Sequence, residues 1–457
     1  MSTAKRLLVI VTLCGVMQAV ESFGEAAADP RRAASALVVG IGFVLIASWF
    51  SGRVFATMRL PKLTGYLAMG ILAGPLLGIL APSTVRDLGL VNGMATALIA
   101  LTGGSEMDFR AMRPLFRSIA WISLIAVVGT ALALAFVAWL LAPQLAFMHG
   151  LTPLGRIAIA VVVGIVVVAQ SPAVVVAIRA ETGADGPVAR TSLGVVVLAD
   201  LLVIVLFAIA SAAADAVLSG TSDFERTGRD MTWELFGSLG IGISIGAILS
   251  GWLRFVGERG LDLFVLLVCF VAAEVGRRVR LDPLLLMLAA GMFVENVSGR
   301  GALLRRAFED ASLPVYIVFF TVAGASVHLG ELPSVAVPAA ALITVRALGL
   351  YFGTSLAARI AGADPKVRRY GGFGLLPQAG LAIALSQLFT RTFPSLGAST
   401  AALTLSIVAI NEIVAPALFR IALVRSGEAS LATTSSVGTL EAVAADQNVA
   451  VGDDAAS

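Results

Sequence analysis

Long apolar runs recur along the whole chain, and most approach the length that crosses a lipid bilayer. Of the 457 residues, 58% are hydrophobic and 13% are charged, whereas a soluble domain has roughly 45–50% and 25%. The bilayer core offers no water to unpaired backbone groups, so spanning segments of this kind have to be helices. The sequence therefore predicts an all-α, polytopic membrane protein.

Thirteen runs are expected to be transmembrane helices. They lie approximately at residues 35–55, 62–80, 88–105, 115–142, 154–178, 189–213, 232–253, 260–276, 282–297, 311–328, 334–358, 370–391 and 397–424. The chain then divides into a signal peptide with a short segment (1–34), a transmembrane domain (35–425) and a disordered cytoplasmic tail (426–457). The tail is predicted to be disordered because it has too little apolar patterning to form a packed domain.

The N-terminal run is short for a spanning helix. Lys5 and Arg6 precede it and small residues follow it, which is typical of a secretory signal peptide. A short helix that is retained is the alternative. Lys and Arg elsewhere predict the orientation, because they accumulate in cytoplasmic connections. With the mature N-terminus outside, the outer connections hold roughly half as many as the inner ones. We therefore expect a cell (inner) membrane protein with a cytoplasmic C-terminus, although Arg277, Arg278 and Arg280 violate the pattern.

One carboxylate, Asp200, lies in the middle of the apolar run from Thr191 to Ala214. A charge at that depth costs roughly 2.5–3.5 kcal/mol on insertion scales. Such residues usually face a bundle interior or a water cavity and mark an ion or proton path. Asp200 is therefore the first candidate for a transport site.

Two stretches resemble each other, 59–70 at the start of the second span and 280–291 at the start of the ninth. Arg, Leu, Pro, Leu-Ala and Gly recur in the same order, and the two spans are expected to begin on opposite sides of the membrane. This pattern predicts an inverted repeat of five helices, spans 2–6 against spans 9–13. Chance similarity between two Leu- and Ala-rich segments is the alternative.

Proline and glutamine interrupt the fourth helix of each predicted repeat. Gln170, Ser171 and Pro172 lie inside the fifth span, and Pro377 and Gln378 lie inside the twelfth. Paired interruptions at corresponding positions point to a binding site at the membrane midplane, where freed carbonyls can coordinate a cation. Two ordinary proline kinks are the alternative, since membrane helices tolerate them.

Further polar residues lie inside the late spans. Arg346 is near the middle of the eleventh span, and Asn411 and Glu412 are in the last one. A buried Arg needs a carboxylate or carbonyl partner. Arg346 is expected to neighbour Asp200 or to pair with a glutamate such as Glu274 or Glu412, unless it snorkels to an interface. Glu412 is expected to have either a structural role, in which it pairs with Arg or caps backbone, or a functional role.

Several activities are not supported by the sequence. The two cysteines and two histidines form no metal-ligand spacing, and there is no phosphate-binding loop. We find no nucleophile–base pair that would indicate an enzyme, no cofactor motif and no sign of nucleic-acid binding. The expected partners are monovalent cations, protons and the lipid bilayer.

The chain resembles the monovalent cation:proton antiporter-2 superfamily, the Kef-type Na⁺ or K⁺/H⁺ exchangers. The motifs that carry the resemblance are Arg59-Leu60-Pro61 through Gly65-Tyr66-Leu67 to Gly70-Ile71-Leu72-Ala73-Gly74-Pro75, Leu101–Asp108, Ser171-Pro172-Ala173 with Asp200, Phe319–Gly324, Pro377–Ala382 and Asn411–Phe419. The resemblance implies a sodium/proton antiporter-like fold, in which a core of broken helices moves against a dimerisation domain, and hence a homodimer.

Two departures from the family pattern limit what is carried over. Ala199 precedes Asp200 where relatives often have Asp, Asn or Gln. A two-carboxylate site, associated in the superfamily with electrogenic exchange, is therefore unsupported. An attached nucleotide-binding domain, which many Kef-type relatives carry, is not expected either, nor is ligand gating through such a domain.

The resulting hypothesis is antiport with one site. A proton and a monovalent cation compete for Asp200, while Ser171, Gln170 and backbone carbonyls supply further oxygens. One acid makes electroneutral exchange the simplest stoichiometry. Two alternatives remain: a sodium-coupled symporter of an organic anion on a similar fold, and a non-transporting membrane sensor or scaffold.

Overall fold

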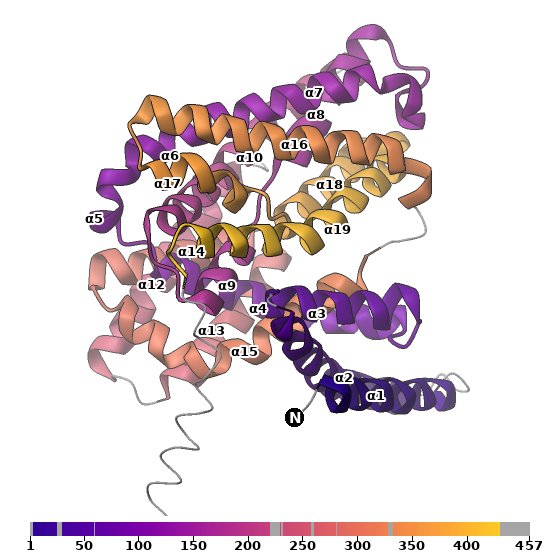
Figure 1. The fold of residues 1–457 in the computed structure, drawn as a ribbon, viewed down its shortest axis with the longest axis vertical. Helices are drawn as coiled ribbons and strands as arrows, with labels where there is room; N and C mark the ends of the chain where they lie inside the picture. Colours follow the sequence, from indigo (N-terminus) through magenta and orange to yellow (C-terminus); the bar gives the residue numbers. More distant parts are fainter. Residues whose placement is uncertain are drawn as a thin grey trace, which may run out of the picture.

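Helices make up every regular element that the structure describes. The computed structural model describes residues 3–24, 30–58, 60–219, 229, 232–256, 260–279, 281–327 and 332–429. No strand occurs within these ranges. Figure 1 shows the helices stacked in a bundle, with α1 and α2 side by side at one edge. The all-α membrane architecture predicted from the apolar runs is confirmed.

The first half of the chain contains long helices joined by short 3-10 or π turns, labelled η. In order they are α1 (Thr3–Gly24), α2 (Pro30–Thr57), α3 (Lys62–Ile71), η1 (Leu72–Leu76), α4 (Pro82–Ser105), α5 (Phe109–Met112), η2 (Arg113–Leu115), α6 (Phe116–Ile122), η3 (Ser123–Val128), α7 (Gly129–Leu140), η4 (Ala142–Gln144), η5 (Ala146–Met148), α8 (Pro153–Val168), α9 (Pro172–Thr182) and α10 (Pro187–Ser219). Proline recurs at the first position because its missing N–H would be unpaired there in any case.

The second half has the same character. Its elements are η6 (Trp233–Gly237), α12 (Ser238–Phe255), α13 (Leu261–Val279), α14 (Pro283–Phe293), η7 (Val294–Ser298), α15 (Gly301–Ala325), α16 (Leu332–Ala361), α17 (Pro365–Tyr370), η9 (Gly371–Leu375), α18 (Gly380–Thr392) and α19 (Pro394–Arg425). Each of the thirteen predicted spans contains a helix.

Fewer segments meet the requirements for a membrane span. Within the described residues, seven are long and apolar enough, and an eighth is added if a pair bent by 46° counts as one span. Three shorter apolar helices, at Gly93–Ser105, Pro283–Ser298 and Leu313–Ala325, fall below the length. The count of thirteen crossings therefore stays a prediction.

Glycines set the closest helix crossings. A Cβ on Gly104 in α4 would collide with the Leu288 carbonyl oxygen in α14, and one on Gly70 in α3 would collide with the Thr321 carbonyl oxygen in α15. The pairs α4–α14 and α3–α15 can therefore pack only without side chains at these points. In contrast, α8 and α9 are buried nearly all round, which places them at the centre of the bundle.

Both ends of the chain carry predictions that the structure leaves open. Residues Thr3–Gly24 form α1, which packs against α2 through Met17, Phe43 and Val44. Cleavage of this segment as a signal peptide stays a prediction. The predicted disordered tail lies outside the described residues from 430 onward. Its first residues, 426–429, are described and turn back onto the start of α10.

Candidate functional site

The first helix interruption separates α8 from α9. Residues 169–171 are not helical, and Ser171 is extended with φ −133° and ψ 105°. Pro172 accounts for this geometry, because it disfavours helical backbone at the preceding residue and has no N–H to donate. The Ser171 hydroxyl caps α9 by accepting from the Val174 N–H at 3.4 Å.

The second interruption separates η9 from α18. Residues 376–379 are not helical and contain Pro377 and Gln378. The helical segments on either side are bent by 46° relative to each other. Both stretches predicted to interrupt their helices are therefore non-helical in the structure.

Arg346 joins the two breaks. It lies on α16 with 1% of its surface exposed. Its Nε donates to the Val167 carbonyl (2.9 Å), and its Nη2 donates to the Ala169 carbonyl (2.9 Å). On the other break, Nη1 donates to the Leu376 carbonyl (2.7 Å) and Nη2 to the Leu375 carbonyl (3.4 Å). These carbonyls end interrupted helices, where the backbone carries partial negative charge.

The partners of Arg346 are therefore carbonyls and not glutamates. Glu274 instead makes an i,i+4 pair with Arg278 at 3.1 Å. No ion pair joins Arg346 to Glu412 in the described part of the chain, and Arg346 does not snorkel to an interface. The physical reason is that each helix break leaves several carbonyls unpaired in the same small volume, which a guanidinium with five N–H donors can satisfy.

Gln378 and Asn411 extend this network to α19. The Gln378 Nε2 donates to the Val167 carbonyl (2.9 Å), which also accepts from Arg346. The Asn411 Nδ2 donates to the Gln378 Oε1 (2.9 Å). All three side chains are buried. Both breaks, α16 and α19 are thus held in one arrangement by hydrogen bonds.

Asp200 lies on α10, which packs against α8, α9 and α18. The residue is 2% exposed, and neither carboxylate oxygen has a hydrogen-bond partner among the described residues. The charged group that acts on it electrostatically is Asp282, which has the same sign and caps the start of α14. A buried carboxylate without a partner costs several kcal/mol. Asp200 therefore requires a proton or a cation to be neutralised.

A cavity of about 330 Å³ lies next to the first break. Gln170, Ser171 and Glu412 line it together with apolar residues of α15, α18 and α19. Gln170 is 1% exposed, and both polar atoms of its side chain lack a hydrogen-bond partner within the described ranges. Four of the predicted site residues, these three and Pro172, are thus brought together at one cavity, while Asp200 is not among the lining residues.

Most of the chain matches a known protein family. The profile described as "Sodium/hydrogen exchanger, transmembrane" matches residues 41–425. The chain belongs to the sodium/hydrogen exchanger family. It is therefore a membrane transport protein and not an enzyme.

Solved structures show the same fold. The sodium proton antiporter MjNhaP1 from Methanocaldococcus jannaschii at pH 8 superimposes with a TM-score of 0.62 at 15% identity, covering 87% of this chain and 100% of that one. An electron-microscopy structure of the same antiporter gives 0.64 at 15% identity, covering 85% and 95%. At this identity the match establishes the fold alone. No curated protein sequence matches this exchanger significantly.

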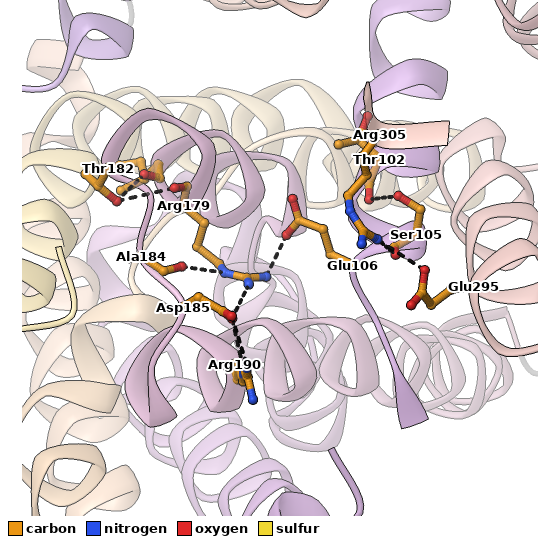
Figure 2. Close-up of polar contacts among 11 residues, drawn as sticks. Thr102, Ser105, Glu106, Arg179, Thr182, Ala184, Asp185, Arg190, Glu295 and Arg305 are labelled. Atoms are coloured by element: carbon orange, nitrogen blue, oxygen red, sulfur yellow. Dashed lines mark hydrogen bonds and ion pairs between the residues drawn. The ribbon is translucent and has the colours of Figure 1, made fainter. Parts of the chain in front are cut away.

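A second polar cluster of the exchanger lies at the opposite end of α9 (Figure 2). Arg179 pairs with Glu106 at 2.7 Å and with Asp185 at 3.3 Å, and Arg190 pairs with Asp185 at 2.7 Å. The hydrogen bond from Arg190 holds the pKa of Asp185 below its ordinary value, while burial raises the pKa of Glu106. The cluster ties the ends of α4 and α9 to the start of α10.

From the sequence, Glu106 and Asp108 at the end of the third span are expected to have loop or cap roles, and the cluster is not predicted. Asp108 does cap α5, accepting from the Arg110 N–H at 2.8 Å. The partner of Glu106 is 73 positions away in the chain. Only the arrangement of helices brings the two side chains together, so no local signal could have revealed the pair. Within the described residues, no group of three His, Cys, Asp or Glu could hold a structural metal ion.

Proposed function

We propose that this exchanger is a secondary antiporter in which a monovalent cation and a proton compete for Asp200. The observation that carries the proposal is the Asp200 carboxylate, which is buried and has no hydrogen-bond partner among the described residues. Its charge must be neutralised before the surrounding helices can change position at low cost. A proton and a cation do this equally well, but not together at one carboxylate.

Alternating access follows from this requirement. With Asp200 neutralised by either ion, the site can be exposed to one side of the membrane and then to the other. The empty, charged site moves less readily because its charge would have to cross an apolar barrier. Each time the site crosses the membrane with one ion bound, it returns with an ion bound, and this coupling gives antiport.

We infer that the first break supplies further oxygens for the cation. The carbonyls of Val167 and Ala169 already accept hydrogen bonds from Arg346. The Gln170 amide oxygen has no such partner, and the Ser171 hydroxyl oxygen keeps a free lone pair after capping α9. We infer that Gln170 and Ser171, rather than the occupied carbonyls, complete the cation's shell.

Electroneutral exchange is the simplest stoichiometry. The residue before Asp200 on α10 is Ala199, which is not an acid, so there is no second carboxylate next to Asp200 in the sequence. One carboxylate that binds either one proton or one cation exchanges them one for one. The identity of the cation, Na⁺ or K⁺, and membership of the Kef-type subfamily are part of this proposal and follow from the sequence resemblance.

The main alternative is a sodium-coupled symporter of an organic anion. An anion site needs a positive group that can reach its ligand. Among the described residues that line the cavity, the one charged side chain is Glu412. Arg346 is enclosed, and four carbonyls accept its hydrogen bonds. These observations favour a cation as the cargo.

We also propose the membrane, the orientation and the oligomeric state of the exchanger. The connection that carries Arg179, Asp185 and Arg190 is expected on the cytoplasmic side, in the inner membrane, with the N-terminus outside and the C-terminus inside. A homodimer is expected from the resemblance. A reporter fused to the C-terminus, active only in the cytoplasm, tests the orientation, and light scattering of the purified protein in detergent tests the dimer.

Transport is tested with purified protein in liposomes that contain a pH-sensitive dye. A proton gradient is imposed, and Na⁺, K⁺ or Li⁺ is then added outside. We expect cation-dependent dequenching by the wild type and none by Asp200→Asn, whose melting temperature should match or exceed that of the wild type, because the amide removes a buried acid. Full exchange by Asp200→Asn would contradict the proposal. Substrate-dependent Na⁺ uptake without proton counterflow would favour the symporter, and no response of folded protein to any cation would favour the sensor.

A further inference from the structure

A carboxylate separate from Asp200 faces the cavity. Glu412 lies on α19 with 3% of its surface exposed and lines the cavity beside Gln170 and Ser171. It makes no hydrogen bond or ion pair to any residue in the described ranges. A buried carboxylate that faces open space and has no protein partner points to a ligand, because it is otherwise costly to maintain.

The charge of the cavity selects the sign of that ligand. Glu412 is the one charged side chain among the described lining residues, and the rest are polar or apolar. An isolated negative charge with low-dielectric walls focuses the potential and raises the local concentration of cations. The unpartnered Gln170 amide oxygen lies on the same cavity and can contribute to coordination.

The cavity also provides a route to this carboxylate. It extends from Gln170 and Ser171 at the break to Ser326 and Val327 at the end of α15, where Ser326 is exposed. A cation that enters at the Ser326 end encounters Glu412 and the break within one continuous space. The polar cluster of Figure 2 lies at the other ends of α9 and α15. The cavity and the polar cluster are therefore on different faces of the molecule.

Glu412 is placed next to the network that connects the breaks. The preceding residue, Asn411, donates to Gln378, which in turn donates to the Val167 carbonyl. The two consecutive side chains thus have different surroundings. Asn411 bonds to the segment at the helix break, and Glu412 faces the cavity. A cation held at Glu412 lies beside the segment that must rearrange during transport.

We propose that Glu412 is a recruiting site for monovalent cations, distinct from the transport site at Asp200. This inference rests on the proposed antiport and adds a second site to it. Glu412 binds the partly hydrated cation on the cavity side and passes it to the break. It does not itself carry the cation across the membrane.

The test is transport by Glu412→Gln in proteoliposomes of uniform orientation. When the cation is presented on the cavity side, we expect the apparent KM to rise roughly tenfold, the change that corresponds to about 1.4 kcal/mol of lost binding. The maximal rate at saturating cation should stay close to that of the wild type. The KM measured from the opposite side should not change, because the cavity does not reach that face.

Matched variants separate recruitment from folding. Asp262→Asn makes the same acid-to-amide change at an exposed position of α13 and should leave both KM values unchanged. Glu412→Asp keeps the charge and should restore a KM within about twofold of the wild type, a difference of about 0.4 kcal/mol. If Glu412→Gln does not fold, a KM for Glu412→Asp raised equally from both sides would overturn the proposal.

The failures of the two proposals are distinguishable. Absence of exchange by the wild type would remove the antiport itself. Wild-type exchange with an unchanged KM in Glu412→Gln would overturn the recruiting site alone. Loss of exchange in folded Glu412→Gln at every cation concentration would also overturn it, because Glu412 would then belong to the transport site.

Discussion

Arg346 illustrates at the scale of one residue how a charge is kept inside an apolar bundle. Its side chain is 1% exposed, and its hydrogen bonds run to backbone carbonyls that the two breaks leave without a helical partner. The residue and the breaks therefore depend on each other. Without the breaks the guanidinium would have no acceptors, and without Arg346 several carbonyls would be buried and unpaired.

We predict that Arg346→Gln destabilises the exchanger strongly. One amide cannot replace hydrogen bonds to four carbonyls, and leaving such groups buried without a partner costs roughly 3–5 kcal/mol. The melting temperature of the purified protein in detergent measures the effect. Arg278→Gln is the matched control, because the Arg278 side chain is 78% exposed and its pair with Glu274 contributes little. Equal melting temperatures for the two variants would contradict the role of Arg346.

At the scale of elements, the helix contacts are related in pairs. Spans 2 and 9 of the predicted repeats contain α3 and α14, and spans 3 and 10 contain α4 and α15. The structure packs α3 on α15 and α4 on α14, so one contact becomes the other when the repeats are exchanged. Gly70 and Gly291, which correspond in the two similar stretches, both lie at these contacts. The inverted repeat stays a prediction, and this relation supports it.

The glycine contacts predict opposite effects of one substitution at two positions of α4. Gly104→Ala should destabilise the protein, because its Cβ would collide with the Leu288 carbonyl oxygen. Gly93→Ala should be neutral or stabilising by up to about 1 kcal/mol, since alanine favours helix and the nearest atom to its Cβ would be 3.5 Å away. Melting temperatures in the same detergent compare the two. A Gly104→Ala protein as stable as Gly93→Ala would refute the close crossing.

Glu428, three residues after the end of α19, caps the helix that carries Asp200. The Glu428 carboxylate accepts from the N–H groups of Val188 (2.7 Å) and Ala189 (2.8 Å) in the first turn of α10. Substitution of such a cap costs typically about 1 kcal/mol. We predict that Glu428→Gln speeds hydrogen exchange at the start of α10, measured by mass spectrometry. A chain truncated after Ala429 should exchange as the wild type does. Unchanged protection in Glu428→Gln would show that the cap is dispensable.

At the scale of the whole molecule, the two ends of the central helices differ in charge. One end of α9 lies at the cavity with Glu412, and the other end carries the ion pairs of Glu106, Arg179, Asp185 and Arg190, which line a second cavity of about 340 Å³. Since these pairs join α4, α9 and α10, the ion-site helix is fixed at its first turns. The exchanger thus has one cavity with a lone carboxylate and a second cavity lined by ion pairs.

The pKa of Asp185 predicts a pH dependence for the face that carries the ion pairs. Because Arg190 holds the pKa below its ordinary value of about 3.9, the contribution of Asp185 to stability is present above that value and is lost as pH falls through the lower, folded value. The wild type should therefore be slightly more stable than Asp185→Asn at pH 7, and the difference should vanish in acid. The effect is small because the Asp185 side chain is 59% exposed. A difference in melting temperature that grows on acidification would contradict the assignment.

The sequence predicted the helical fold, the breaks at Pro172 and Pro377 and the candidate Asp200, because each leaves a local signal: a long apolar run, a proline inside it, or a charge at depth. It could not predict that Arg346 binds carbonyls, that Glu106 pairs with Arg179, or that Glu428 caps α10. These contacts join residues far apart in the chain and depend on how the helices pack. Hydrophobic patterning constrains which face of a helix is buried, but not which neighbour covers it.

Competition between a proton and a cation at Asp200 is the central claim, and the pH dependence of the apparent cation KM tests it most directly. The measurement is made in oriented proteoliposomes from the side opposite the cavity, so that Glu412 does not contribute. Competition predicts that the KM rises about tenfold for each unit by which pH falls below the pKa of the site, with an unchanged maximal rate. A KM that stays constant with pH, while only the maximal rate falls, would contradict a shared carboxylate.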